Sequence, residues 1–116
     1  MKYLCLVYPG ADFVPRQTDV PAYVAVRDAM TEAGVYLDSG ALQPAGSATT
    51  LHGRDGEIVL TDGPFAEMGE HVGGYFLLEC ADLDDAVRWA ATIPAAAANG
   101  SVEIRPLVDL MAPGRA

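Results

Sequence analysis

The sequence predicts an α+β protein in which two helices cover one face of an antiparallel sheet. The expected elements run strand–helix–strand, then a short hairpin, then strand–helix–strand. This order is typical of helices that lie together on one face of such a sheet. In addition, residues 2–8 are largely apolar on both sides of the expected strand, and residues 75–80 are so except at Glu79. One layer of helices covers only one face, so we expect a second copy of the chain to cover the other.

The first half of the chain predicts a strand, a helix and a second strand. Residues 2–8 place apolar side chains on both faces of the first strand. Residues 18–19 are suited to cap a helix that has Pro21 in its first turn and ends at Gly34. Residues 35–42 then predict the second strand of the sheet.

A hairpin is predicted between the two halves. Residues 48–52 and 57–61 form two short apolar runs, and Asp55-Gly56 lies between them. This dipeptide is a strong hairpin signal because both residues tolerate positive φ. The hairpin ends at Asp62 and therefore determines where the following loop begins.

The second half predicts another strand, helix and strand. Residues 75–80 form an apolar strand, and Asp82 is a good N-cap for the helix that follows. Pro94 is expected to stop this helix, and residues 95–100 are expected to form a loop of small residues. Residues 101–105 predict the last strand.

Length and charge limit the class of protein. The 116 residues predict a single domain, 1–116, with a tail from about residue 108. The net charge of −9 disfavours nucleic acids and anionic membrane surfaces as partners. No apolar run approaches the length of a membrane span. We therefore expect a cytoplasmic protein that has neither a nucleic acid nor a membrane as its partner.

The cysteines and glycines indicate no bound metal or cofactor. Cys5 and Cys80 lie in apolar strand-like runs, so we expect buried, reduced thiols. Their spacing matches no CxxC motif and no metal site. The glycines match no phosphate-binding pattern. We therefore expect no metal and no cofactor.

The candidate site is the loop that follows the hairpin. Gly63 and Pro64 exclude regular helix and strand, so the chain must turn there. Asp62 precedes the turn at a strand end, and Phe65 places a large ring just after it. A carboxylate, a fixed bend and an aromatic ring within four positions are typical of a binding or catalytic site.

Two interpretations of this loop stay open. Asp62 either caps the turn through its side chain or acts as a general base or ligand anchor beside Phe65, where burial would raise its pKa. Glu67 is either a solvated charge or a second carboxylate in the same pocket. Both roles of Asp62 are compatible if each of its oxygens performs one of them.

Other candidate residues lie outside the loop. Tyr75, like Phe65, is either a core or interface residue or a ring on which a ligand stacks. Arg105 either pairs with Glu103 or binds an anionic substrate. The histidines, His52 and His71, are interpreted as surface or capping residues.

Four runs of the sequence together resemble the YciI-related proteins of the DGPF-motif branch. They are TDGPFAE, GGY at residues 73–75, ADLDDAVRWA and SVEIRPL. The resemblance extends from Met1 to about Leu107. It implies a ferredoxin-like α+β fold of the form βαβ–hairpin–βαβ that pairs into a dimeric α+β barrel. The biochemical role of the family is largely undefined.

The resemblance also bears on catalysis. Other YciI-related proteins carry a histidine near the start of the first helix, often discussed together with an aspartate as a catalytic pair. In this chain the equivalent-looking position is Tyr23. A tyrosine can form a hydrogen bond there, but with an ordinary pKa of about 10 it is a poor base.

Two hypotheses of function follow. The first is a cofactor-free enzyme in which Asp62 performs acid–base chemistry on a small aromatic or carbonyl-bearing molecule, by analogy with the isomerases, lyases and oxygenases of the wider barrel superfamily. The second is a non-catalytic protein that binds a small ligand or has a regulatory accessory role. The second is also implied by the resemblance, because such proteins are often encoded beside extracytoplasmic-function sigma factors. Either protein is expected to be a homodimer.

Overall fold

The computed structural model describes residues 1–10, 19–65 and 71–111. It confirms the α+β class and every predicted strand and helix. The elements follow in the order β1 (Lys2–Tyr8), α1 (Val20–Glu32), β2 (Tyr36–Ala41), the 3-10 turn η2 (Ala45–Ser47), β3 (Thr49–Arg54), β4 (Glu57–Asp62), β5 (Gly74–Glu79), α2 (Leu83–Ala90), α3 (Pro94–Ala97) and β6 (Ser101–Pro106).

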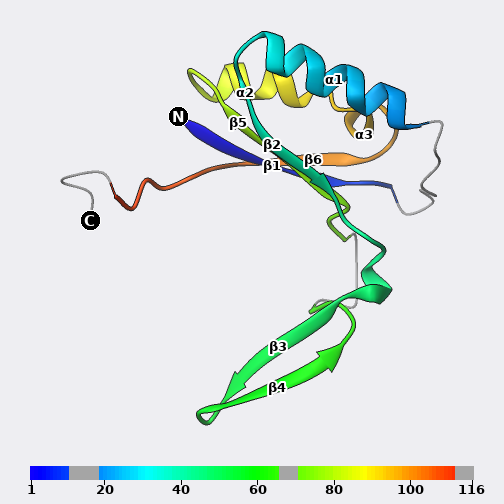
Figure 1. Cartoon of the computed structure of the whole chain (residues 1–116), viewed down its shortest axis with the longest axis vertical. Helices are drawn as coiled ribbons and strands as arrows, with labels where there is room; N and C mark the ends of the chain where they lie inside the picture. The colour runs from blue at the N-terminus through cyan, green and yellow to red at the C-terminus, as the bar shows by residue number, and fades with distance from the viewer. Residues whose placement is uncertain (11–18, 66–70, 112–116) are drawn as a thin grey trace.

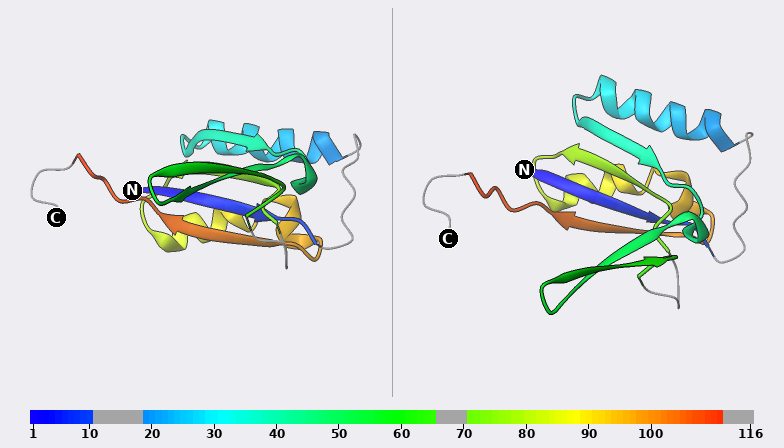
Figure 2. Two further views of the ribbon diagram at one scale, coloured as in Figure 1. Left: turned by 90° about the horizontal axis from the view of Figure 1, so that it is seen from below. Right: turned by 60° about the horizontal axis from the view of Figure 1, so that its bottom comes forward.

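The main sheet has four strands in the order β2-β5-β1-β6. Each neighbouring pair is antiparallel. The helices lie on one face of this sheet, as Figure 1 shows, and the two additional views agree (Figure 2). This arrangement is consistent with the expected ferredoxin-like α+β fold. The opposite face, which none of the described helices covers, is called the open face below.

The hydrophobic core lies between the main sheet and its helices. Alternate residues of β1 and β5 point into it, because successive side chains of a strand face opposite sides. The helices contribute Met30, Ala86 and Ala90. The fully buried side chains of largest volume are Met30, Leu78, Ile93 and Cys5. The core therefore uses only one face of each strand.

The predicted helix caps and helix ends are confirmed in part. Asp82 caps α2, because its Oδ1 accepts a hydrogen bond of 2.8 Å from the Asp85 amide. Asp19 is the N-cap residue of α1, but its side chain makes no capping hydrogen bond. The prediction of a loop over residues 95–100 was wrong for its first residues, which are helical. Pro94 begins the short helix α3 instead, since proline suits the first turn of a helix.

The hairpin forms as predicted, as a separate two-stranded sheet of β3 and β4. Asp55 and Gly56 have φ values of 52° and 82°, as a tight hairpin turn requires. Figure 1 shows the hairpin extending away from the main sheet, on the side opposite the helices. Among the described residues, no helix is long and apolar enough to span a membrane.

Candidate functional site

The open face has an apolar centre. Leu4 and Leu6 of β1 and Leu77 of β5 point to this face, and each is only partly exposed. The strand register places Leu4 opposite Leu77, and Leu6 opposite Tyr75. Together the three leucines form an apolar floor between two groups of polar side chains.

The first polar group joins Tyr75 of β5 to Asp38 of β2. The Tyr75 hydroxyl donates a hydrogen bond of 3.1 Å to Asp38 Oδ2. This bond is the main cause that raises the pKa of Tyr75 above its ordinary value, with smaller contributions from desolvation and from the charge of Asp38. Asp38 Oδ1 accepts a second bond of 2.8 Å from the Ser39 amide.

An irregularity in β2 turns Asp38 toward the open face. The pairing with β5 shifts between Tyr36 and Asp38, so Tyr36 lies opposite Leu78 whereas Asp38 lies opposite Leu77. The extra residue reverses the side on which the following side chains point. Tyr36 consequently packs against the core, and Asp38 reaches Tyr75.

The second polar group lies across the floor, on β1 and β6. The Tyr8 hydroxyl donates a hydrogen bond of 3.1 Å to Glu103 Oε1, which is the main cause that raises the pKa of Tyr8. Glu103 also lies 3.9 Å from the Arg105 guanidinium. The expected ion pair of Arg105 with Glu103 is therefore present. Glu79 does not join it, because it pairs with the amino group of Met1 at 2.6 Å.

The Asp62 loop lies apart from this face, at the base of the hairpin. Asp62 is exposed at the end of β4, opposite Thr49. Gly63 follows with a φ of 103° and donates a hydrogen bond of 2.7 Å to the Ala48 carbonyl. The turn is thus confirmed, and no described residue donates a hydrogen bond to the Asp62 carboxylate. Glu67 lies outside the described residues.

Asp62 and Phe65 lie on different sides of the hairpin. The Phe65 ring packs near His52, with ring centroids 5.5 Å apart. His52 and Thr49 are three positions apart on β3, so their side chains face opposite ways. Asp62 faces the Thr49 side. Within a single chain, the Phe65 ring therefore does not form an apolar wall beside this carboxylate.

Tyr23 is separated from the other candidates by the sheet. It lies on α1 and packs against the core on the helix side, where burial raises its pKa. Tyr75 and Arg105 both lie on the open face, on neighbouring rows of the register. The structure therefore brings Tyr75 and Arg105 to one surface and excludes Tyr23 from it.

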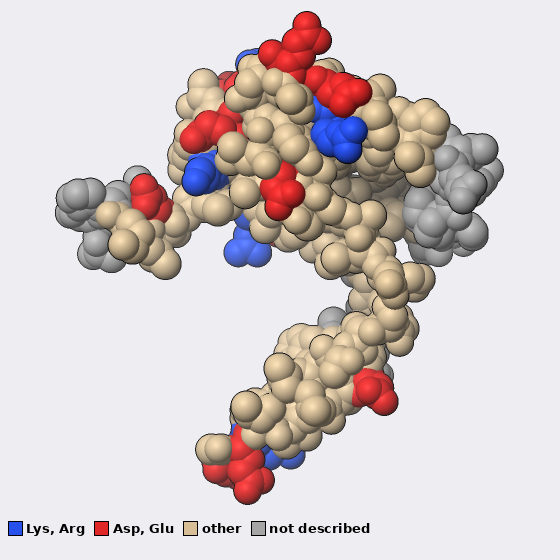
Figure 3. All heavy atoms as spheres, viewed as in Figure 1, with Lys and Arg blue, Asp and Glu red and all other residues tan. Residues whose placement is uncertain are grey.

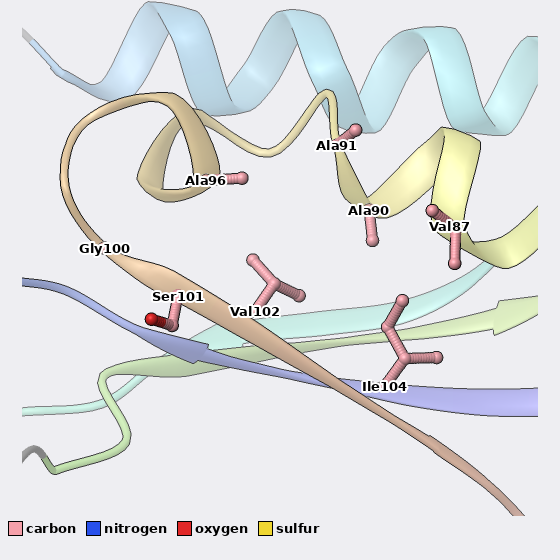
Figure 4. Close-up of a pocket in the computed structure, with 8 residues that line it drawn as sticks. All are labelled: Val87, Ala90, Ala91, Ala96, Gly100, Ser101, Val102 and Ile104. Atoms are coloured by element: carbon pink, nitrogen blue, oxygen red, sulfur yellow. The ribbon is translucent and has the colours of Figure 1, made fainter.

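Two shallow pockets lie away from the open face. One, of about 230 Å³, lies between β6 and the helices α2 and α3 and has small or apolar walls (Figure 4). The other, of about 290 Å³, lies where the hairpin joins the sheet, between the η2 segment, Pro64 and His71. The described residues that line these pockets include no cluster of charged side chains.

The described residues hold no group of three or more histidine, cysteine or acidic side chains that could bind a metal ion. Cys5 and Cys80 are buried and unpaired, as predicted. Burial raises the pKa of the Cys5 thiol to about 11, with a further contribution from Cys80. A buried thiol of this kind is a packing group and a poor nucleophile.

Sequence reasoning missed Asp38 and Tyr8 as members of the site. Asp38 falls within the predicted second strand, residues 35–42, and is not among the candidate site residues. A carboxylate followed by Ser39-Gly40 in the middle of an apolar strand was the available signal, since Asp and Gly are depleted in strands. Tyr8 gave no signal, because its partner Glu103 is distant in the sequence.

Comparison with known proteins gives two matches. Residues 1–111 match the model of the YCII-related domain. An uncharacterized protein of Rhizobium meliloti (strain 1021), R00369, is 41% identical over 91 residues, which cover 78% of this chain and 73% of the relative. The extent of both matches shows that the chain belongs to the family of YCII-related domain proteins.

Proposed function

We propose that this protein binds a small molecule on the open face of its main sheet. The observation that carries the proposal is the Tyr75–Asp38 hydrogen bond at the margin of the leucine floor. Binding sites commonly combine an apolar wall with a few placed polar groups. The floor supplies the wall, and the Asp38 carboxylate supplies a fixed acceptor.

The charges favour a ligand that carries a hydrogen-bond donor. The Tyr75 hydroxyl donates to Asp38, so it presents an acceptor to a ligand, and a carboxylate retains acceptor capacity after two bonds. No basic side chain among the described residues forms an ion pair with Asp38, whereas Glu103 has Arg105 within 4.0 Å. The net charge of −9 also attracts cations. We therefore expect an aromatic or apolar amine or alcohol.

We propose further that the protein is a homodimer in which a second copy covers the open face. The chain exposes 8440 Å², whereas a compact monomer of 12.2 kDa exposes about 6,100 Å². The excess is of the size that an obligate interface buries. The radius of gyration of 16.4 Å is also larger than the compact value of about 13 Å. Light scattering that found only monomer at micromolar concentration would contradict this.

Acid–base catalysis by Asp62 is the second candidate function. The observation in its favour is that Asp62 lies on the same hairpin side as Leu51 and Leu60, whose pairing fixes that side. A carboxylate becomes a useful base when it is desolvated, and Asp62 is exposed in the single chain. Its burial must therefore come from another molecule. The unpaired cysteines support a cytoplasmic location for either function.

Titration calorimetry with two probes of similar shape tests the binding proposal. Phenethylamine carries a cationic donor, and 3-phenylpropanoate carries an anion. We expect phenethylamine to bind at least tenfold more tightly, and Asp38→Asn to weaken it tenfold, or about 1.4 kcal/mol. Glu103→Gln is the matched control because it removes a carboxylate from the other side of the floor. Tighter binding of 3-phenylpropanoate, lost in Arg105→Gln, would support an anion site at Arg105 instead.

A further inference from the structure

We propose that the β3–β4 hairpin is a dimerisation arm that packs on the open face of a second copy and brings Asp62 to the Tyr75–Asp38 site of that copy. The inference rests on the proposed homodimer. It adds which surfaces meet and which residue crosses between the chains. The binding site is then formed by two chains.

One side of the hairpin is an apolar surface that no other described part of the chain covers. Leu51, Ile58 and Leu60 are 64%, 74% and 67% exposed. The register pairs Leu51 with Leu60 and Gly53 with Ile58, so the three large side chains share one side. We call this side the arm face. An isolated two-stranded hairpin is marginally stable in water, so an apolar arm face indicates a packing partner.

The other side of the hairpin is less exposed and more polar. It carries His52 opposite Val59 and Thr50 opposite Thr61. The Phe65 ring lies near His52, and the Thr50 hydroxyl donates a bond of 2.8 Å to the Gly63 carbonyl. Val59 is 44% exposed, less than any of the three residues of the arm face. The apolar arm face is thus suited to contact another protein surface, whereas the more polar side is suited to contact water.

The hairpin of the same chain does not cover the open face. Figure 3 shows open space between the hairpin and the body of the molecule. Backbone hydrogen bonds join described residues at the sheet end and at the hairpin end of the two connections. The Leu42 amide donates to Gly73 at 2.8 Å, the Gly73 amide donates to Val7 at 2.7 Å, and the Gly63 amide donates to Ala48 at 2.7 Å. These bonds order the chain on each side of the connections, and we infer that the occupant of the space comes from a second molecule.

A second copy fits both unpartnered surfaces at once. The open face offers Leu4, Leu6 and Leu77, and the arm face offers three apolar side chains that pack on part of this floor and leave its margin at Tyr75 and Asp38 for the ligand. In a two-fold dimer each copy contributes one arm and receives one. The arm face and the open face of both copies are then buried, and the assembly is closed and does not extend into a filament.

The position of Asp62 explains what the arm adds to the site. Asp62 follows Ile58 and Leu60 by steps of two along β4, so its carboxylate faces the same side. Asp38 forms no ion pair with a basic side chain of the described residues, and Arg105 lies across the floor beside Glu103. Asp62 next to Asp38 gives a site with two carboxylates, which suits the cationic ligand of the proposed function. Docking also removes water from Asp62, which a single chain does not do.

Two neighbouring substitutions on β4 test the arm face. Leu60→Asp places a charge on the arm face, and Val59→Asp places the same charge on the other side, one residue away. Both positions are exposed in the single chain, so neither change should unfold it. By sedimentation equilibrium we expect Leu60→Asp to raise the dimer dissociation constant at least a hundredfold and Val59→Asp to change it less than about threefold. Equal effects of the two variants would overturn the proposal.

Cross-linking tests whether the contact is between chains. Leu60→Cys protein is mixed with Leu6→Cys protein and treated with a short bismaleimide. We expect a covalent dimer in the mixture at many times the yield from either variant alone, because Cys5 and Cys80 are buried and react slowly. If the hairpin closes on its own sheet, a Leu6→Cys/Leu60→Cys chain instead gives a cross-linked monomer and the mixture gives no dimer, which refutes the inference.

These outcomes are independent of the ligand test. A dimer that survives Leu60→Asp refutes the arm but leaves binding at Asp38 standing. Loss of the expected phenethylamine binding, with the cross-link still formed, refutes the proposed function but leaves the arm standing.

Discussion

The ring of Tyr75 lies directly across Gly40 on the neighbouring strand. A Cβ atom on Gly40 would lie 2.8 Å from Cε1 of Tyr75, closer than real contacts allow. Gly40 and Tyr75 are also opposite each other in the β2–β5 register. The missing side chain therefore leaves the space in which the Tyr75 ring lies while its hydroxyl reaches Asp38. Gly40 positions the polar group of the open face.

Gly40→Ala should displace the Tyr75 ring and break its bond to Asp38. That bond is the main cause of the raised pKa of Tyr75, so we expect this pKa to fall toward the ordinary tyrosine value. Ultraviolet difference titration, with Tyr75→Phe used to assign the transition, measures the change. Gly46→Ala is the control, because a Cβ there meets nothing within 4 Å and Gly46 lies outside the main sheet and the arm face. An unchanged Tyr75 titration in Gly40→Ala would show that the ring does not depend on this space.

Removal of the cap of α2 should destabilise the fold. Asp82→Ala deletes the acceptor of the Asp85 amide, and such changes cost about 1 kcal/mol. Asp84→Ala, in the same first turn, removes an equal charge without removing the cap. Urea denaturation should show a larger loss of unfolding free energy for Asp82→Ala than for Asp84→Ala. Equal losses would mean that the effect is one of charge near the helix end.

The burial of Cys5 predicts a loss of stability in alkali. The thiol has a pKa of about 11 in the folded chain and 9.0 ordinarily. Between these values the unfolded chain releases the thiol proton and the folded chain keeps it, so the free energy of unfolding falls as pH rises and is almost unaffected below about pH 8. We expect Cys5 to account for a fall of about 1 kcal/mol between pH 8 and 10.

Cys5→Ala isolates this contribution. The variant is less stable at every pH because it leaves a cavity, but its unfolding free energy should decline less steeply above pH 9 than that of the wild type. Urea denaturation at pH 8, 9 and 10 compares the two. Parallel curves would mean that the thiol does not titrate at different pH in the two states.

Local patterns were sufficient to predict the elements of the fold. The Asp55-Gly56 turn and the Asp82 cap depend on residues within four positions of one another, so a sequence alone indicates them. The alanines after Pro94 favour a helix by propensity, yet α3 is too short for its pattern to be distinct from a loop. The elements that were missed or misread are those that packing determines.

The candidate site was only partly predictable for the same reason. Tyr75 and Asp38 are 37 positions apart, and their contact depends on the irregular pairing at Leu37 and on the gap over Gly40. Tyr23 and Tyr75 lie on opposite sides of the sheet, and this depends on the tertiary arrangement of helix and sheet. The placement of Asp62 relative to a ligand depends on a second chain, which one sequence does not describe.

Asp62→Asn provides the sharpest test of the site. The amide keeps the size of the carboxylate and removes its charge, and Asp62 is exposed in the single chain. We therefore expect the unfolding free energy to change by less than about 1 kcal/mol. If Asp62 reaches the Tyr75–Asp38 site of a second copy, it adds negative charge where a cationic ligand binds. The affinity for phenethylamine should then fall tenfold or more, or about 1.4 kcal/mol, while the dimer persists.

Glu57→Gln is the matched control for this change. Glu57 is exposed at the other end of β4 and, five positions from Asp62, faces the opposite side of the hairpin. Its loss alters the net charge by the same amount, so a general electrostatic effect on a cationic ligand would appear in both variants. We expect Glu57→Gln to change phenethylamine affinity less than about twofold. If the Asp62→Asn protein folds, forms the dimer and binds phenethylamine with wild-type affinity, the carboxylate of Asp62 is not part of the binding site.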